Sequence, residues 1–156
     1  MATGTSGDRA VRLLLSLVIV VMAVALVYVI VTPAQRAAEA QQLTDLSRQR
    51  MSDVRNALSA WRTVHDAYPT TLDSVALFAR ADSAFQAQLS TEEGRTSEFN
   101  ADSMLVSPRS GERFQYAVVS DSAGLEIYWL GNPDVPEDSI GARIASPAYR
   151  NAASWE

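Results

Sequence analysis

The chain has 156 residues, with 13 basic residues, all of them arginine, against 18 acidic residues, a single histidine and no cysteine. The missing cysteine and lysine exclude thiolate metal sites, disulfides, cysteine nucleophiles and Schiff-base chemistry, and one histidine cannot build a histidine-rich metal site. Residues 33–156 hold eleven of the arginines and seventeen of the acidic residues, a balance of −6 that argues against nucleic acid as a partner. From this inventory we expect a protein that is not an enzyme and has no cofactor.

The N-terminal region combines a polar tail with a long apolar run. Residues 1–10 are small and polar, which predicts a flexible tail. The run 13–31 is uncharged over 19 residues and would span roughly 28 Å as a helix, close to the thickness of a bilayer interior. We therefore expect a single transmembrane helix over 11–32, in contact with lipid. A cleavable signal peptide is the alternative, but the run exceeds the usual length of about 7–15 residues, and Pro33 disfavours a cleavage site.

The orientation of this helix follows from the charges at its ends. Arg9 and Arg12 precede the run, whereas Arg36 follows it and is partly offset by Glu39. The positive-inside rule then favours a cytoplasmic N-terminus and a C-terminal domain on the periplasmic side of a bacterial cytoplasmic (inner) membrane. Tyr28 lies in the run where an aromatic residue at the outer membrane interface is expected.

The composition turns helical after Pro33, and no glycine or proline interrupts it until Pro69. Pro33 is either the first residue of a new helix or a kink in one continuous helix. We expect a stalk helix over 34–68 that is amphipathic with one buried face. Apolar residues spaced by three and four define that face, and two further residues widen it: Met51, Val54, Ala57, Leu58, Trp61, Val64, His65 and Tyr68.

A Tyr-Pro break follows the stalk helix. Thr70 and Asp73 have the spacing of a capping box, which predicts a short helix from Leu72. A second short helix is expected through Phe85 and Leu89, and the polar stretch 90–103 is expected to be a loop.

The last third changes to the period of β-structure. Phe114, Tyr116 and Val118 alternate with polar or small residues, which predicts a strand with one buried face. A serine- and glycine-containing turn at 120–124 leads to a partner strand at 125–130. We expect an antiparallel sheet within 104–130 and an irregular tail over 131–156, which contains three prolines. The fold class is therefore α+β, with the extramembrane domain at 33–130.

This order of elements resembles the type IV pilin family, particularly the pseudopilins of type II secretion. Two stretches carry the resemblance: Asn56-Ala57-Leu58 followed by Ala67-Tyr68-Pro69-Thr70-Thr71-Leu72, and Ser107-Pro108-Arg109-Ser110-Gly111-Glu112-Arg113-Phe114-Gln115-Tyr116. The first is similar to the family's Tyr-Pro-Thr turn at the end of the long helix, and the second to its entry into the sheet. The resemblance implies a pilin-like body in which the long helix packs on a small antiparallel sheet.

The N-terminus differs from the family's pattern. The prepilin peptidase site of the family has a glycine before a phenylalanine-rich run that carries one glutamate. Here Gly7 is followed by Asp8-Arg9-Ala10, and the apolar run contains no glutamate. We therefore expect a pilin-like body on an ordinary membrane anchor, without processing or polymerisation.

An acidic cluster in the C-terminal region contains Asp134, Glu137 and Asp138, with Asn132 nearby. Oxygen ligands of this kind suit calcium, and the resemblance adds that some pseudopilins bind calcium in a comparable loop. The spacing matches no EF-hand, so a solvated acidic turn is the favoured interpretation and calcium the alternative.

Aromatic residues suggest interfaces with other proteins. Tyr28, Tyr128, Trp129 and Trp155 are the candidates, although Tyr128 and Trp129 point to opposite faces of a strand, so that one of them should lie in the core. His65 is expected to be a partly buried structural residue rather than a switch or a ligand.

Catalysis by a Ser-His-Asp triad is not expected. Ser59 or Ser74 would have to combine with His65 and Asp66, and no nucleophile-elbow sequence supports such an arrangement.

These features predict a non-catalytic, single-pass structural or accessory subunit that packs against a larger membrane complex. That complex would be energy-transducing (photosynthetic or respiratory) or a secretion machine. The alternatives are a minor pseudopilin of a type II secretion or type IV pilus system, and a membrane-tethered module that binds calcium or another ligand.

Overall fold

The computed structural model describes residues 5–91, 95 and 97–156 and confirms an α+β fold with a long N-terminal helix and a small antiparallel sheet. The chain divides into two compact units, residues 1–42 and 43–156. Helix α1 (Thr5–His65) has 61 residues, and Pro33 lies inside it rather than at the start of a new helix. The predicted flexible tail at 1–10 is thus helical from Thr5, because a helix extends at little cost once it is nucleated. The first four residues lie outside the described part.

The described residues of the first unit, 5–42, are all helical, and the large apolar side chains of residues 11–29 are exposed. α1 is the one helix of the described residues that is long and apolar enough to cross a membrane. We call its exposed apolar part, residues 13–29, the span segment. The exposed large side chains in it are Leu13, Leu14, Leu15, Leu17, Val18, Ile19, Val20, Val21, Met22, Val24, Leu26, Val27, Tyr28 and Val29.

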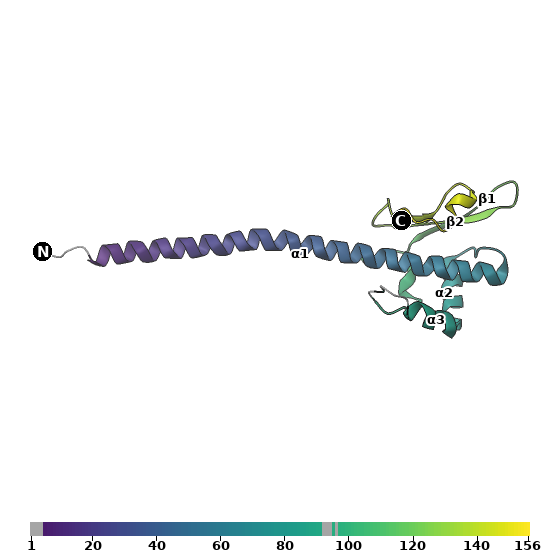
Figure 1. Cartoon of the computed structure of the whole chain (residues 1–156), viewed down its shortest axis with the longest axis horizontal. Helices are drawn as coiled ribbons and strands as arrows, with labels where there is room; N and C mark the ends of the chain where they lie inside the picture. The colour runs from purple at the N-terminus through teal and green to yellow at the C-terminus, as the bar shows by residue number, and fades with distance from the viewer. Residues whose placement is uncertain (1–4, 92–94, 96) are drawn as a thin grey trace. The chain divides into compact units, whose positions relative to one another are not determined.

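The second unit is built around the 43–65 part of α1. Helices α2 (Leu72–Ala81) and α3 (Ser83–Ser90) lie on one side of it and the sheet on the other (Figure 1). This part of α1 therefore buries two faces, where the sequence predicted one. The core of the unit combines Met51, Val54, Ala57 and Leu58 of α1, Leu72, Val75, Ala76 and Ala79 of α2, Phe85 and Leu89 of α3, and Tyr128, Leu130 and Ile140 of the sheet.

The sheet has three antiparallel strands in the order β1-β2-β3. Strand β1 (Gln115–Ser120) pairs with β2 (Glu126–Gly131), and β2 pairs with β3 (Ser139–Gly141). The β1–β2 hairpin closes where the Asp121 N–H donates to the Leu125 carbonyl at 3.1 Å. Two short 3₁₀ helices complete the unit, η1 (Ser103–Leu105) and η2 (Pro147–Tyr149).

The C-terminal region differs from the irregular tail predicted for 131–156. It contains β3, whose Ile140 is fully buried. The last residues then run along the outer edge of β3. The Gly141 N–H donates to the Ala152 carbonyl, and the Ser154 N–H donates to the Ser139 carbonyl, both at 2.8 Å. A three-residue strand between prolines gives almost no periodic signal, because its pairing partner supplies its stability.

Two details of the helix ends also differ from the prediction. α1 ends at His65, three residues before the predicted end, because Asp66 adopts a left-handed conformation with φ of 57°. The N-cap of α2 is Thr71, not Thr70, and its side chain makes no capping hydrogen bond to the backbone. Asp73 instead forms an ion pair with Arg113, so the predicted capping box is absent.

Replacing a core leucine tests this packing. Leu58→Ala should lower the free energy of unfolding by about 2–5 kcal/mol, because a fully buried leucine leaves a cavity when it is shortened. Leu77→Ala is the matched control, since Leu77 also lies on a helix but is 62% exposed, and it should cost less than about 0.5 kcal/mol. Chemical denaturation of the full chain in detergent measures both values. Equal losses would contradict the packing.

Candidate interaction surfaces

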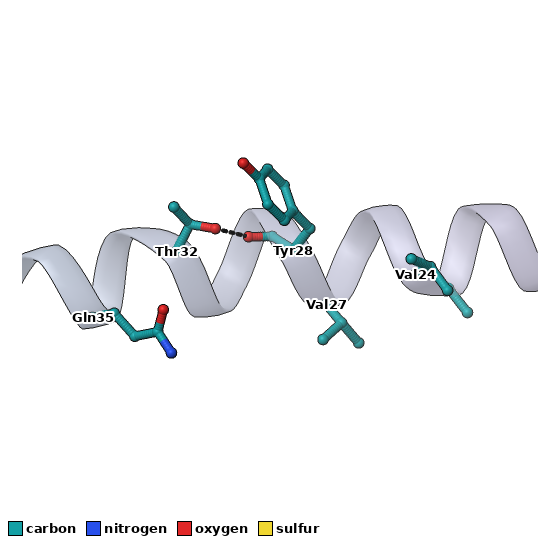
Figure 2. A pocket seen from close by; sticks show the side chains of 6 residues that line it. Val24, Val27, Tyr28, Thr32 and Gln35 are labelled. Atoms are coloured by element: carbon teal, nitrogen blue, oxygen red, sulfur yellow. Dashed lines mark hydrogen bonds between the residues drawn. The ribbon is translucent and has the colours of Figure 1, made fainter.

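The span segment offers a continuous apolar surface rather than a pocket. A shallow apolar surface runs along α1 past Val24, Val27, Tyr28 and Gln35, and Figure 2 shows these side chains following one helix without enclosing a space. The Thr32 hydroxyl donates to the Tyr28 carbonyl at 2.6 Å, which satisfies its hydrogen-bonding need within the helix. Such a surface suits contact with lipid or with another apolar helix.

Tyr28, the first of the aromatic interface candidates, is 70% exposed on the span segment. This position leaves its ring accessible, as an interfacial role requires.

Tyr128 is the one of the two adjacent aromatic residues that lies in the core, and it is therefore not available to a partner. It is 1% exposed, and its hydroxyl donates to Asn151 Oδ1 at 2.9 Å. Its ring packs edge-on against Tyr68, with centroids 5.1 Å apart. Burial raises the pKa of the Tyr128 hydroxyl, so this group stays a neutral hydrogen-bond donor.

Trp129 points to the opposite face of β2 and is half-buried by its own chain. Its ring lies so close to Gly131 that a Cβ atom there would come within 2.5 Å of it. The Arg143 guanidinium covers the ring at 3.8 Å from its centroid. The C-terminal segment thus shields most of this interface candidate.

Trp155 also packs onto the domain. It is half-buried against the core, and the Arg48 guanidinium lies 5.5 Å from its ring centroid. The neighbouring Glu156 carboxylate accepts from Arg55 at 2.8 Å. Both tryptophans of the C-terminal half thus contribute to folding, because chain segments that are distant in sequence cover them.

The two aspartates of the acidic cluster accept hydrogen bonds from different side chains of the same domain. Asp138 is buried and receives two hydrogen bonds of 2.9 Å from the Arg48 guanidinium. Asp134 accepts from the hydroxyls of Ser107 and Ser110, and these bonds hold the pKa of its carboxyl below the ordinary value. Glu137 is exposed.

Asn132 sits between these groups. Its amide donates to Ser47 Oγ at 2.9 Å, and its side-chain oxygen accepts from the Asp134 N–H at 3.1 Å. The described residues contain no group of three or more histidine, cysteine or acidic side chains that could hold a metal ion. The cluster therefore acts as a hydrogen-bonded turn rather than the solvated turn expected from the sequence.

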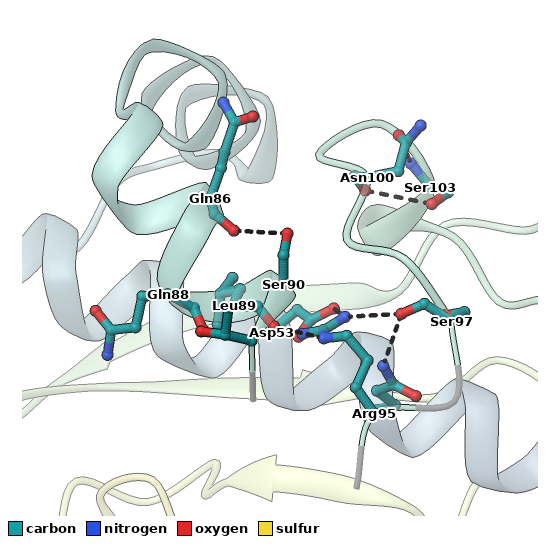
Figure 3. A network of polar contacts seen from close by, with 11 residues as sticks. Asp53, Gln86, Gln88, Leu89, Ser90, Arg95, Ser97, Asn100 and Ser103 are labelled. Carbon is teal, nitrogen blue, oxygen red and sulfur yellow. Dashed lines mark hydrogen bonds and ion pairs between the residues drawn. The ribbon is translucent and has the colours of Figure 1, made fainter. Parts of the chain in front are cut away.

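A buried ion pair joins Arg95 to α1 (Figure 3). The Arg95 guanidinium donates to both oxygens of Asp53 on α1, at 2.5 and 3.1 Å, and the two side chains are 7% and 5% exposed. Arg95 Nε also donates to the Leu89 carbonyl at 2.6 Å, and the guanidinium reaches the Ser97 carbonyl. Sequence reasoning missed this pair, because residues 42 positions apart share no local pattern.

The residues of the hypothetical triad are not assembled. His65 is exposed, not partly buried, and its ring packs on Trp61 with centroids 4.1 Å apart. Ser59 donates to the Arg55 carbonyl of its own helix, and Ser74 contacts the Thr71 hydroxyl. The described residues show no hydrogen bond between His65 and a serine.

A polar depression of about 300 Å³ lies near the end of α1, beside Ser59, Arg62, Thr63, Asp66, Tyr68, Arg150 and Asn151. Arg62 donates to the Glu126 carbonyl at 3.1 Å and stacks on Tyr68, and the Asn151 amide donates to Ser59 Oγ. Several of its polar groups thus hold the domain together rather than leaving a prepared nucleophile and base.

Comparison with models of protein families, with curated proteins and with solved structures finds no match to this chain.

Breaking the buried ion pair tests the role of Arg95. Asp53→Ala should lower the free energy of unfolding by about 3–5 kcal/mol, because it removes one partner of a buried ion pair that is held by two hydrogen bonds. Asp73→Ala breaks the exposed pair with Arg113 and should leave the stability nearly unchanged. Urea titration of both variants gives the comparison. A stable Asp53→Ala variant would show that the pair contributes little.

Calcium should not stabilise the domain. Asp134 and Asp138 already accept hydrogen bonds from serine hydroxyls and from Arg48, so millimolar calcium should shift the melting temperature by no more than about 1 °C. Scanning calorimetry with calcium and with a chelator measures the shift. A larger rise that disappears in Asp134→Asn/Asp138→Asn would instead establish a calcium site.

Proposed function

We propose that this chain is a non-catalytic, single-pass membrane subunit whose domain at 43–156 packs against other subunits of a larger membrane complex. The observation that carries the proposal is the span segment: a continuous, exposed apolar surface within one helix. The domain adds support, because many of its polar side chains make internal contacts and no catalytic constellation is apparent among the described residues.

The energetics favour lipid around the span segment. Burying one large aliphatic side chain is worth about 1.5–3 kcal/mol, and the described residues of the chain cover none of this surface. A helix needs roughly 20 apolar residues to cross a bilayer, and its backbone hydrogen bonds are satisfied internally. A single crossing thus accounts for the length and for the exposure together.

The charges at the ends of the segment support one orientation. Arg9 and Arg12 would remain in the cytoplasm, and the domain would lie on the periplasmic side of a bacterial inner membrane. Tyr28 would then lie near the outer interface, where aromatic side chains are favoured.

The pilin-like body is part of the same proposal. A long helix, a Tyr-Pro break and a β-meander occur in the order that the resemblance to type IV pilins implies. This order also keeps a second candidate open, a minor pseudopilin. Without a glutamate in the apolar run, the chain lacks the group that helps register pilin subunits in a filament, and this favours the accessory subunit.

Placing charges in the span segment tests membrane anchoring. Val20→Arg/Val24→Arg should move the protein from the membrane fraction to the soluble or aggregated fraction, because each central arginine costs about 2.5–3.5 kcal/mol on insertion. Ala34→Arg/Ala38→Arg has the same spacing on an exposed part of α1 beyond the segment and should stay in the membrane after carbonate extraction. Equal extraction of both variants would argue against the anchor.

The mass of the native protein distinguishes the accessory subunit from the minor pseudopilin. An unprocessed subunit should show a mass that includes residues 1–7, and it should co-purify in mild detergent at a fixed ratio with other membrane proteins. A mass that begins after Gly7, with a methylated new N-terminus, would favour the pseudopilin.

A further inference from the structure

The two edge strands of the sheet, β3 and β1, differ in whether another segment forms backbone hydrogen bonds along their outer side. Beyond β3, the last residues of the chain cover the edge through the bonds from Gly141 to Ala152 and from Ser154 to Ser139. Beyond β1, no backbone hydrogen bond continues the sheet outward from residues 115–120 within the described chain. One edge is thus closed, and the other is open.

The hydrogen bonds around β1 show which backbone groups point outward. The Asp121 N–H donates to Leu125, on the β2 side, whereas the Phe114 N–H donates to Leu105, on the opposite side. Because alternate residues of a strand face opposite neighbours, Tyr116, Val118 and Ser120 direct their N–H and C=O groups away from β2. These groups have no partner among the described residues.

The open edge lacks the usual protection against pairing. Its sequence, QYAVVS, contains no charge and no proline. Its register with β2 runs without a bulge from the Gln115–Gly131 pair to the Ser120–Glu126 pair. Natural edge strands are commonly blunted by lysine, proline or a bulge, so an uncharged regular edge is a template for another strand.

We propose that β1 pairs antiparallel with β1 of a second copy of this chain, about a two-fold axis at Val118. In this register Val118 faces Val118 of the other copy, and Tyr116 faces Ser120. All the outward groups of both strands then form hydrogen bonds, which no shifted register achieves. A two-fold interface is self-complementary, as this arrangement requires.

The flanking residues agree with the same register. It brings Gln115 opposite Asp121 of the other copy, so an amide donor meets a carboxylate and no like charges face each other. The paired length is limited on one side by the Leu105–Phe114 hydrogen bond and on the other by the turn at Asp121. Pairing of the two β1 strands does not require that the chain be anchored in a membrane.

Cysteine cross-linking of the full chain in detergent tests the register, and the absence of native cysteine gives a clean background. In the proposed pair the Cα atoms of the two Val118 residues are about 5.5 Å apart, within the range of a disulfide. Ser120→Cys is the matched control on the same exposed strand, because the Cα atoms of the two Ser120 residues would be about 14 Å apart. Val118→Cys should form a disulfide dimer at least tenfold faster than Ser120→Cys.

Charge complementation gives a second readout at the same position. Val118→Lys and Val118→Glu should each reduce the dimer at least tenfold in light scattering, because like charges would meet at the axis. An equimolar mixture should restore a mixed dimer. The near-ultraviolet circular dichroism of the tryptophans should be unchanged, since Val118 is 36% exposed on an edge strand.

Three results would overturn the proposal: equal cross-linking rates for the two cysteine variants, no dimer for wild type or Val118→Cys, or a disulfide from Val118→Cys to a different protein. Failure here would leave the carbonate-extraction result of the span segment untouched. Loss of anchoring would equally leave the β1 pairing intact.

Discussion

The second unit depends on the burial of α1 from two sides. Between residues 43 and 65 this helix packs against α2 and α3 on one side and against the sheet on the other. Met51, Val54 and Leu58 have no exposed surface, although many other residues of this part of the helix are polar. The helix can serve as a core because its polar side chains are engaged as well.

Those polar side chains make the connections between elements specific. Asp53 accepts from Arg95, Arg48 donates to Asp138 in the turn before β3, and Ser47 accepts from Asn132. Apolar burial alone would allow the sheet to slide along the helix, because it has no direction. Directional bonds at several heights along α1 select one position, since a shift would leave buried polar groups unsatisfied.

The sequence predicted the elements that carry a local pattern. The long helix, the two short helices after it and the β1–β2 hairpin follow from spacing, alternation and turn residues. It did not predict β3 or which of Tyr128 and Trp129 is buried, nor that Arg143 and Arg48 cover Trp129 and Trp155. These depend on contacts across the fold, where periodicity carries no information. The acidic cluster is another example. Its composition suits a bound cation, but Asp134 accepts hydrogen bonds from Ser107 and Ser110, and Asp138 accepts them from Arg48.

The contacts that hold the last residues of the chain against β3 explain why one edge of the sheet is covered and the other is not. The last residues of the chain reach β3 because Trp155 packs on the core beside Arg48 and because Glu156 pairs with Arg55. The same contacts keep this segment away from β1, which lies on the far side of β2. An intramolecular strand that covers one edge cannot cover the other in a three-stranded sheet. Among the described residues no segment continues the sheet beyond β1, so this edge either faces solvent or pairs with a second polypeptide, and its uncharged sequence favours the pairing.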